Sequence, residues 1–505
     1  MPDPVPASEP ARPPARWRLP DDPDLDWLRK RAKRLHRGLL AGDAEAIALL
    51  AEFDPPAPAD GEPIPLARAQ RVLARAFGFP RWDALRARLR TIEHWTRRPG
   101  PDDVRADEPP ADRFLRLAFL SYSRYDAADL ADARAMLEAD PSLATASVWA
   151  LAACGRTDEL AALLADRPEL ARAEGGPYRW SPVLSLCYAR LGGAGGDPVG
   201  SLRVLLDAGA DPDAGFLWHG LTSPFTALAG AFGGGERDEP VHPQSVELAR
   251  LLLDAGADPN DNQTLYNRMF TPRDDHLELL FAYGLGEERP SVWRERLGAD
   301  AYPSPEAMVG EQLRYAAEHG FTDRVRLLLA HGVDPNTRGY HPNLGDQTAY
   351  EIAVRTGHRE IAELLAAAGG RSERLDDVDR LLEAALAGDA ERTAALAADP
   401  GLVARARRQA PDAMITAALY GPIAALELLD GLGFAVTALA GGRTALHEAA
   451  LADRGEVVDW LLAHGADPDV RDRRFDGTPA GWAAHAGHQE LADRLAALET
   501  PAAGS

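Results

Sequence analysis

Apolar residues along most of this chain recur at spacings of three and four, in short blocks separated by turns rich in glycine, aspartate and proline. Four blocks end alike: a leucine-rich run is followed by Gly-Ala-Asp-Pro or Gly-Val-Asp-Pro, at Gly209–Pro212, Gly256–Pro259, Gly332–Pro335 and Gly465–Pro468. This pattern predicts a helix with one buried face, a left-handed glycine after its last turn, and an extended loop begun by aspartate and proline. We call such an extended loop a finger.

The complete repeating unit is clearest near the C-terminal end of the chain, where Thr444 opens the stretch Thr-Ala-Leu-His-Glu-Ala-Ala. Thr444 suits a helix N-cap, and the small alanines allow a second helix to approach closely. That second helix presents Val457, Val458 and Leu461 on one face. The next unit begins at Thr478, 34 residues after Thr444, so the sequence predicts a series of helix pairs.

These residues resemble the ankyrin repeat, with its Thr-Pro-Leu-His opening, its Gly-His turn between helices and its Gly-Ala-Asp finger. The resemblance covers residues 113–498, strongly at the C-terminal end and more loosely elsewhere. It implies an all-α fold, an ankyrin-type α-solenoid of about eleven helix pairs. It also implies that His358, His447 and His488 hydrogen-bond to neighbouring backbone rather than carry out chemistry.

Composition divides the rest of the chain. Residues 1–21 are proline-rich and are expected to be a disordered tail, residues 97–112 read as a linker, and residues 499–505 as a short tail. Residues 22–96 are predicted to be a helical module, and they resemble a module that precedes ankyrin arrays in some bacterial proteins. The scarcity of lysine, with abundant alanine, arginine and aspartate, also suggests a bacterial source.

Charge is distributed unevenly along the chain. The net charge is −23, yet residues 1–98 hold 18 Lys and Arg against 14 Asp and Glu. An acidic body repels phosphate backbones, which makes nucleic acid an unfavoured ligand for most of the protein. The exception is a basic helix face at residues 29–37, which is either a solvated face, a surface that docks on the acidic solenoid, or the site of a regulator that binds nucleic acid.

Catalytic motifs are missing from the sequence. Lys30 and Lys33 are the only lysines, and neither lies in a phosphate-binding loop or a Ser-x-x-Lys motif. No cofactor and no metal site are expected, and Cys154 and Cys187 are predicted to be small core residues. An alternative is a hydrolase-type site in the insertions at residues 190–245, whose titratable residues are His219, Glu236, Asp238, Glu239 and His242.

Targeting signals are also absent from the sequence pattern. No apolar stretch is long enough to span a bilayer, and the first twenty residues contain no apolar core of a secretory signal. We therefore expect a cytoplasmic protein with no membrane partner.

Exposed fingers and inner helices of a helical repeat form an extended surface for partners. Aromatic and arginine side chains there are the usual anchors of an interface. The sequence therefore predicts a non-enzymatic protein-binding scaffold or adaptor. An equal alternative for Phe216 and Trp218 is that they cover the adjacent insertion, Phe225 to Pro243. The candidate partner-binding residues are Phe216, Trp218, His219, Tyr266, Arg268, Arg338, Tyr340, His341, Arg471, Arg474 and Phe475.

Overall fold

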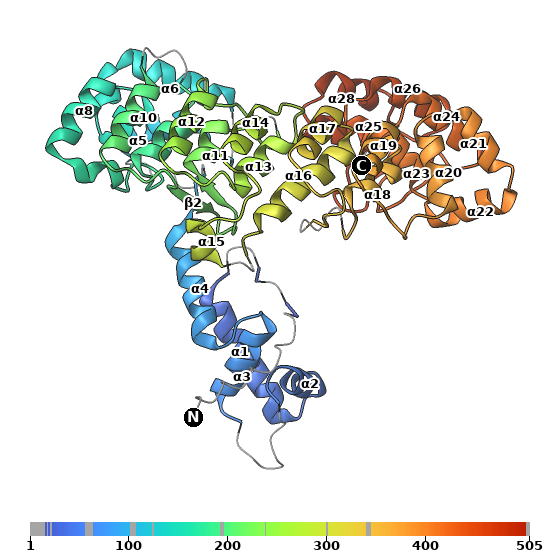
Figure 1. Ribbon diagram of the computed structural model, residues 1–505, viewed down its shortest axis with the longest axis horizontal. Helices are drawn as coiled ribbons and strands as arrows, with labels where there is room; N and C mark the ends of the chain where they lie inside the picture. Colours follow the sequence, from blue (N-terminus) through green and yellow to red (C-terminus); the bar gives the residue numbers. More distant parts are fainter. Residues whose placement is uncertain are drawn as a thin grey trace. The chain divides into compact units, whose positions relative to one another are not determined.

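The computed structural model describes residues 16–17, 19–20, 23–55, 64–100, 108–123, 126–191, 196–237, 239–298, 301–339 and 345–500. The helices are labelled in Figure 1. The chain divides into two units and crosses between them five times, once inside helix α13 (Asn262–Met269), most of which lies in unit 2. Unit 1 comprises Met1–Gly233, Glu239–Thr264 and Arg289–Pro303. Unit 2 comprises Gly234–Asp238, Leu265–Glu288 and Ser304–Ser505.

Unit 1 begins with the predicted helical module. Asp24 caps its first helix by accepting hydrogen bonds from two backbone N–H groups, and Gly42 ends that helix in the left-handed conformation. Leu28 and Ala32 are fully buried on the predicted apolar face. Asp54 joins the second helix to the third by accepting hydrogen bonds from three arginines of the third helix. The helices are α1 (Leu25–Ala41), α2 (Ala44–Phe53), α3 (Leu66–Ala76) and α4 (Trp82–Trp95).

Four helix pairs follow in unit 1. The segments Asp-Pro-Ser-Leu-Ala and Arg-Pro-Glu-Leu-Ala form 3-10 helices, η2 (Pro141–Thr145) and η3 (Pro168–Arg172), where other pairs carry a finger. The helices of unit 1 after the module are α5 (Pro110–Ala118), α6 (Ala127–Ala139), α7 (Val148–Ala153), α8 (Thr157–Asp166), α9 (Pro182–Tyr188), α10 (Pro198–Asp207), α11 (Ala227–Phe232), α12 (Ser245–Asp254) and α15 (Val292–Leu297).

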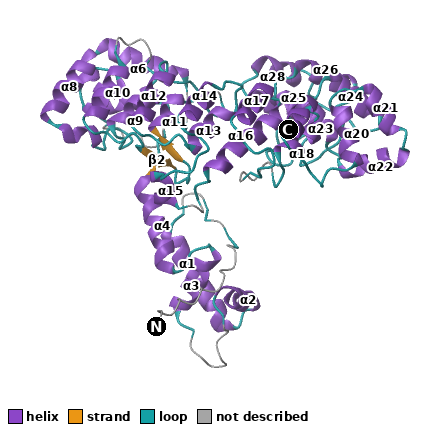
Figure 2. Cartoon of the chain, viewed as in Figure 1, coloured by secondary structure: helices purple, strands orange, loops and turns teal. Residues whose placement is uncertain are grey.

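A small sheet joins the helical module to the segment between α10 and α11. Strand β1 (Thr96–Arg97) directly follows α4 and pairs in parallel with β2 (Gly215–Trp218), which pairs antiparallel with β3 (Pro224–Thr226). Figure 2 shows these strands beside α15, and the rings of Trp95 and Trp293 lie 5.2 Å apart. Arg97, placed by the sequence at the start of a linker, is thus part of a sheet.

Unit 2 contains the other seven pairs, so the described residues form eleven helix pairs in all. Helix α22 (Pro400–Gln409) stands between two of these pairs. The paired helices are α13 with α14 (Asp275–Ala282), α16 (Pro305–His319) with α17 (Thr322–Ala330), α18 (Ala349–Thr356) with α19 (Arg359–Ala367), α20 (Asp377–Leu386) with α21 (Ala390–Ala397), α23 (Ala413–Tyr420) with α24 (Ile423–Gly431), α25 (Ala445–Leu451) with α26 (Gly455–Ala463), and α27 (Pro479–His485) with α28 (Gln489–Ala496). The predicted all-α solenoid is confirmed, with the small sheet as an addition.

The fingers share one local structure. Gly209, Gly256, Gly332 and Gly465 all have positive φ, between 78° and 99°. In each finger the aspartate two residues after the glycine accepts a hydrogen bond from the backbone N–H two residues further on, at 2.9–3.0 Å. This Asx turn explains why aspartate recurs there, since its short carboxylate satisfies the backbone as the chain leaves the helix.

The three Gly-His and Leu-His histidines connect adjacent repeats, as the family resemblance implies. Nε2 of His358 lies 2.9 Å from the carbonyl oxygen of Glu318, Nε2 of His447 lies 3.2 Å from that of Gly477, and Nε2 of His488 lies 3.1 Å from that of Leu451. Each ring bonds to backbone 30 to 40 residues away, so these histidines join neighbouring pairs.

Candidate partner-binding surface

The finger after Pro468 is a well-ordered loop built around one carboxylate. Asp472 is 3% exposed and accepts hydrogen bonds from the backbone N–H groups of Arg474, Phe475 and Gly477, at 2.7–2.8 Å, and from Nε1 of Trp482 at 3.0 Å. Burial alone would raise the pKa of Asp472, but these four donors outweigh it and hold the pKa well below its ordinary value. The loop is therefore preorganised by an ionised aspartate.

This loop presents three of the predicted anchors to solvent. Phe475 is 68% exposed, although a phenylalanine is usually buried. The Arg474 guanidinium lies 4.9 Å from the centre of the Phe475 ring, a cation–π arrangement. Arg471 is exposed as well and donates to the backbone carbonyl of Asp476 at 2.6 Å. Together Arg471, Arg474 and Phe475 form what we call the terminal finger patch.

Arg338 lies on an earlier finger of unit 2, at the edge of a cavity of about 620 Å³. Its guanidinium is 3.0 Å from a carboxylate oxygen of Asp346. Below it, the buried Glu351 accepts from Arg374 at 2.8 Å. Burial would raise the pKa of Glu351, but the hydrogen bonds of Arg374, Ser372 and the Thr348 N–H lower it to about 2. Tyr340 and His341, predicted on the same finger, lie outside the described residues.

Phe216 is not on an exposed face. It is 1% exposed in β2, with its ring stacked on that of Trp180 at 5.0 Å and on that of Phe225 at 5.6 Å. Strand β3 covers it, which agrees with the interpretation that this loop packs against the insertion beginning at Phe225. Trp218 and His219 are half-buried, and Nε1 of Trp218 donates to the carbonyl of Ser121 at 3.1 Å.

Tyr266 and Arg268 are also engaged inside the fold. The sequence treats residues 262–270 as a replaced finger, but most of this stretch is helix α13. The Tyr266 hydroxyl donates to Glu236, and Arg268, 2% exposed, forms an ion pair with Asp275. A buried guanidinium without its carboxylate is costly, so Arg268 serves the core of unit 2 in this structure.

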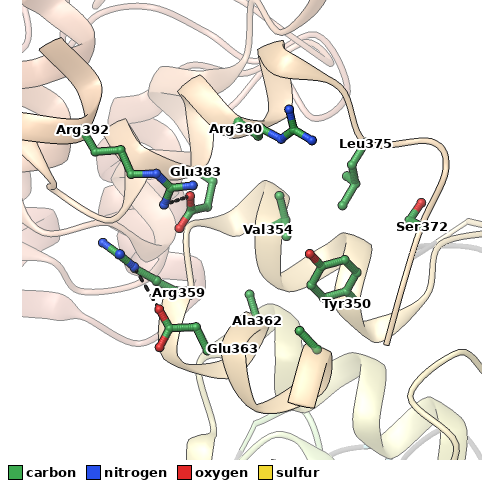
Figure 3. Close-up of a pocket in the computed structure, with 11 residues that line it drawn as sticks. Tyr350, Val354, Arg359, Ala362, Glu363, Ser372, Leu375, Arg380, Glu383 and Arg392 are labelled. Carbon is green, nitrogen blue, oxygen red and sulfur yellow. Dashed lines mark hydrogen bonds and ion pairs between the residues drawn. The ribbon is translucent and has the colours of Figure 1, made fainter. Parts of the chain in front are cut away.

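A second cavity, of about 370 Å³, lies between the pairs α18–α19 and α20–α21 (Figure 3). Its floor carries Tyr350, Val354 and Leu375, and arginines stand around it. Figure 3 shows Arg359 paired with Glu363 and Arg392 paired with Glu383. Because these arginines already carry carboxylate partners, the cavity offers an apolar slot rather than an anion site. Neither this cavity nor the one below Arg338 is visible in the sequence, because each is lined by residues from separate helices and loops.

The residues of the alternative hydrolase site do not show the properties of a catalytic set. His242 is 5% exposed and accepts a hydrogen bond from the Gln244 N–H, and burial, with the nearby charge of Arg190, lowers its pKa to about 3. Glu239 is buried, and Asp238 lies outside the described residues. A histidine of such low pKa is a weak base at neutral pH.

Other chemistry finds little support in the described part of the chain. Those residues contain no group of three or more His, Cys, Asp or Glu placed to hold a metal ion. Cys154 and Cys187 are buried as predicted, and burial raises the pKa of each thiol to about 12, which leaves them protonated and unreactive. None of the described helices combines the length and apolar character needed to cross a bilayer.

The basic face of α1 is exposed except near one aromatic cluster. The Arg31 guanidinium lies over the ring of Trp17 at 4.3 Å and over that of Trp27 at 5.2 Å, so its charge interacts with aromatic rings of the helical module itself. The other basic residues of this face are exposed: Arg29, Lys30, Lys33, Arg34 and Arg37.

Stacked helix pairs with ordered fingers define a helical-repeat protein. Residues 441–473, which contain α25, α26 and the start of the last finger, match the model of the ankyrin repeat family. A Caenorhabditis elegans protein, "Ankyrin repeat and KH domain-containing protein mask-1", is 28% identical over 193 residues, which cover 38% of this chain and 7% of that protein. The protein is thus an ankyrin-repeat-containing protein, and ankyrin repeats are protein–protein interaction modules.

Proposed function

We propose that this protein is a non-enzymatic scaffold or adaptor that holds a protein partner on its fingers, with the terminal finger patch as the main anchor. The observation that carries the proposal is Phe475, an exposed aromatic ring beside the Arg474 guanidinium on a loop that Asp472 holds in one conformation. A preorganised aromatic anchor loses little conformational entropy on binding.

Charge indicates the kind of partner. Arg471 pairs with Asp476 at 3.7 Å, whereas Arg474 lies beside the Phe475 ring, so on a chain whose net charge is −23 Arg474 attracts an acidic segment to this place while the surrounding acidic surface repels it. The partner surface proposed here is an acidic segment that also carries an apolar side chain for Phe475. We place this interaction in the cytoplasm, in keeping with the sequence pattern, and we propose a bacterial source on the composition.

The test compares capture by matched variants. Phe475→Ala combined with Arg474→Ala removes the ring and one charge from the terminal finger patch. Arg494→Ala combined with Leu498→Ala removes the same kinds of group from α28 and the residues after it, where both side chains are more than half exposed. Each variant, and the wild type, is used to capture proteins from the native lysate, with quantification by mass spectrometry.

We expect at least one protein to be captured by the wild type and the α28 control but reduced about tenfold with the finger variant, since an interface anchor contributes 2 kcal/mol or more. If the wild type, the finger variant and the α28 control all capture the same proteins in equal amounts, the terminal finger patch is not the binding site.

A further inference from the structure

Unit 1 contains a cavity of about 300 Å³ where the helical module meets the finger region. Three of its lining residues are aromatic: Trp95, half-buried at the end of α4, and Trp180 and Phe216, whose buried rings stack on each other at 5.0 Å. This volume is at the lower end of the range for ligand sites, enough for one ring and a small polar group. A partly exposed indole ring such as that of Trp95 favours contact with a flat apolar ligand.

Three arginines and two carboxylates, Glu174 and Asp211, line this cavity, so its lining carries one net positive charge. Arg97, 7% exposed, and Arg179 both donate to the same carboxylate oxygen of Glu174, at 2.9 and 3.2 Å. Arg172, at the edge, donates to the backbone carbonyl of Gly209 but has no carboxylate partner among the described residues. Burial lowers the pKa of Arg97 even with Glu174 beside it, as expected for a guanidinium whose charge is incompletely compensated.

Two hydrogen-bond donors that line the cavity are unsatisfied. Nε1 of Trp180 and Oγ of Ser181 are buried and have no hydrogen-bond partner within the described part of the chain. Ser181 stands at the N-cap position of α9, yet its side chain makes no capping bond. Buried donors are almost always paired in folded proteins, so an unpaired pair at one cavity indicates a missing acceptor.

The segment that carries these donors is held firmly. Gly175 and Trp180 exchange two backbone hydrogen bonds of 3.0 Å. A Cβ on Gly175 would lie 2.1 Å from the Trp149 ring, so only glycine fits there. Arg179, inside this turn, has a φ of 54°, in the left-handed region that costs free energy for any residue but glycine. Backbone in a strained conformation that hydrogen bonds hold in place is often found at binding sites.

We propose that this cavity binds a carboxylate carried on a flat apolar group, with the apolar group against Trp95 and the carboxylate facing Arg172, Trp180 and Ser181. A carboxylate supplies acceptor oxygens for the unpaired donors and the negative charge that the arginines lack. Either a small aromatic acid or the C-terminal carboxylate of a peptide ending in an aromatic residue provides this chemistry. The site is separate from the terminal finger patch and does not depend on it.

The experiment follows the indole N–H resonance of Trp180 in full-length protein labelled with ¹⁵N-tryptophan, assigned with the Trp180→Phe variant. The probes are phenylacetate and its neutral isostere phenylacetamide. A second arm compares acetyl-Gly-Gly-Phe with a free carboxylate and the same peptide as its amide. We expect the Trp180 resonance to shift saturably with phenylacetate, and at least tenfold more weakly with phenylacetamide.

Two variants test the role of the edge arginine. Arg172→Gln is expected to weaken phenylacetate binding about fivefold to tenfold, whereas Arg203→Gln, at an exposed position of α10 outside the cavity, leaves it unchanged. Tighter binding of the peptide acid than of phenylacetate identifies a peptide C-terminus as the source, and the reverse identifies a small acid. No saturable shift, equal shifts with acid and amide, or equal effects of the two variants would overturn the proposal.

Discussion

The pKa values of two finger aspartates, Asp472 and Asp213, are shifted in opposite directions, and the number of hydrogen-bond donors around each carboxyl explains the difference. Asp472 receives four hydrogen bonds and is held ionised. Asp213 is half-buried and accepts a hydrogen bond from the backbone N–H of Asp258 at 2.9 Å. Burial raises its pKa to about 6, an effect that this bond and Arg296 lessen and the charges of Asp211 and Asp258 increase. An aspartate thus holds its loop as an ionised carboxylate at one finger, while at another finger the folded protein favours the protonated form.

Replacing Asp213 with asparagine should therefore stabilise the protein near neutral pH. The pKa of Asp213 is about 6 in the folded state, above its ordinary value of 3.8 in the unfolded chain. The stability that the protonated Asp213 carboxyl contributes is therefore full below about pH 3.8 and is lost as the pH rises through about 6. At pH 7.5 the wild type carries a half-buried charge that asparagine lacks, while the amide oxygen still accepts from Asp258. We expect Asp213→Asn to raise the free energy of unfolding by about 2 kcal/mol at pH 7.5.

Chemical denaturation at pH 7.5 and at pH 5.5 checks this prediction. The difference in the free energy of unfolding between Asp213→Asn and the wild type should be smaller at pH 5.5, where the wild-type carboxyl is mostly protonated in the folded state. Asp207→Asn, at an exposed position of α10, controls for the loss of one negative charge. An unchanged advantage at both pH values would show that charge burial is not its cause.

Individual helices begin where local capping allows and are joined by contacts that the local pattern does not contain. Thr348 and Glu351 form a capping box at the start of α18, with reciprocal hydrogen bonds of 3.1 and 3.2 Å. Glu351 is also 1% exposed and depends on Arg374, from the loop before α20. The Thr-x-x-Glu signature is visible in the sequence, but its arginine partner lies 23 residues further on.

Removing that partner should destabilise the pair α18–α19. We expect Arg374→Ala to lower the free energy of unfolding, and by more than removal of an arginine from an exposed ion pair does, because the buried Glu351 carboxylate then loses its partner. The folded-state pKa of Glu351 is about 2, so its contribution is present above its ordinary value of 4.5 and lost as the pH falls through about 2. The variant should therefore show less loss of stability on acidification than the wild type.

Urea unfolding of Arg374→Ala beside Arg380→Ala makes this comparison. Arg380 is 63% exposed and pairs with the equally exposed Asp377, so its removal should cost less than 1 kcal/mol. Equal losses for the two variants would contradict the role assigned to the buried carboxylate.

At the largest scale, each unit contains a series of helix pairs in which neighbouring pairs contact one another. In unit 2 a continuous apolar core runs from Val378 on α20 to Leu495 on α28. The stability of such a series is set by each repeat and by the interfaces between adjacent repeats. A defect in one pair should therefore spread to the next pairs and fade with distance along the series.

Leu461→Ala tests this property. Leu461 on α26 is fully buried, and its truncation should cost about 2–5 kcal/mol. We expect faster amide hydrogen exchange in α25 to α28, and unchanged exchange in α5 to α12. Leu462→Ala, at the neighbouring half-buried position, should have a smaller effect confined to the same helices. Faster exchange throughout the chain would indicate a single cooperative unit instead.

The sequence by itself determined the helix pairs and the turns between them, because a left-handed glycine, an Asx turn and an N-cap are set by residues within a few positions of one another. The recurrence of these signals predicted about eleven pairs, whereas the histidine contacts were implied by the resemblance to the ankyrin repeat. Only the tertiary structure decided which candidate anchors reach solvent. Phe216 and Phe475 both follow a finger proline, yet β3 covers the first and leaves it 1% exposed, while the second is 68% exposed. Exposure depends on which distant segment covers a side chain, and no local pattern encodes that.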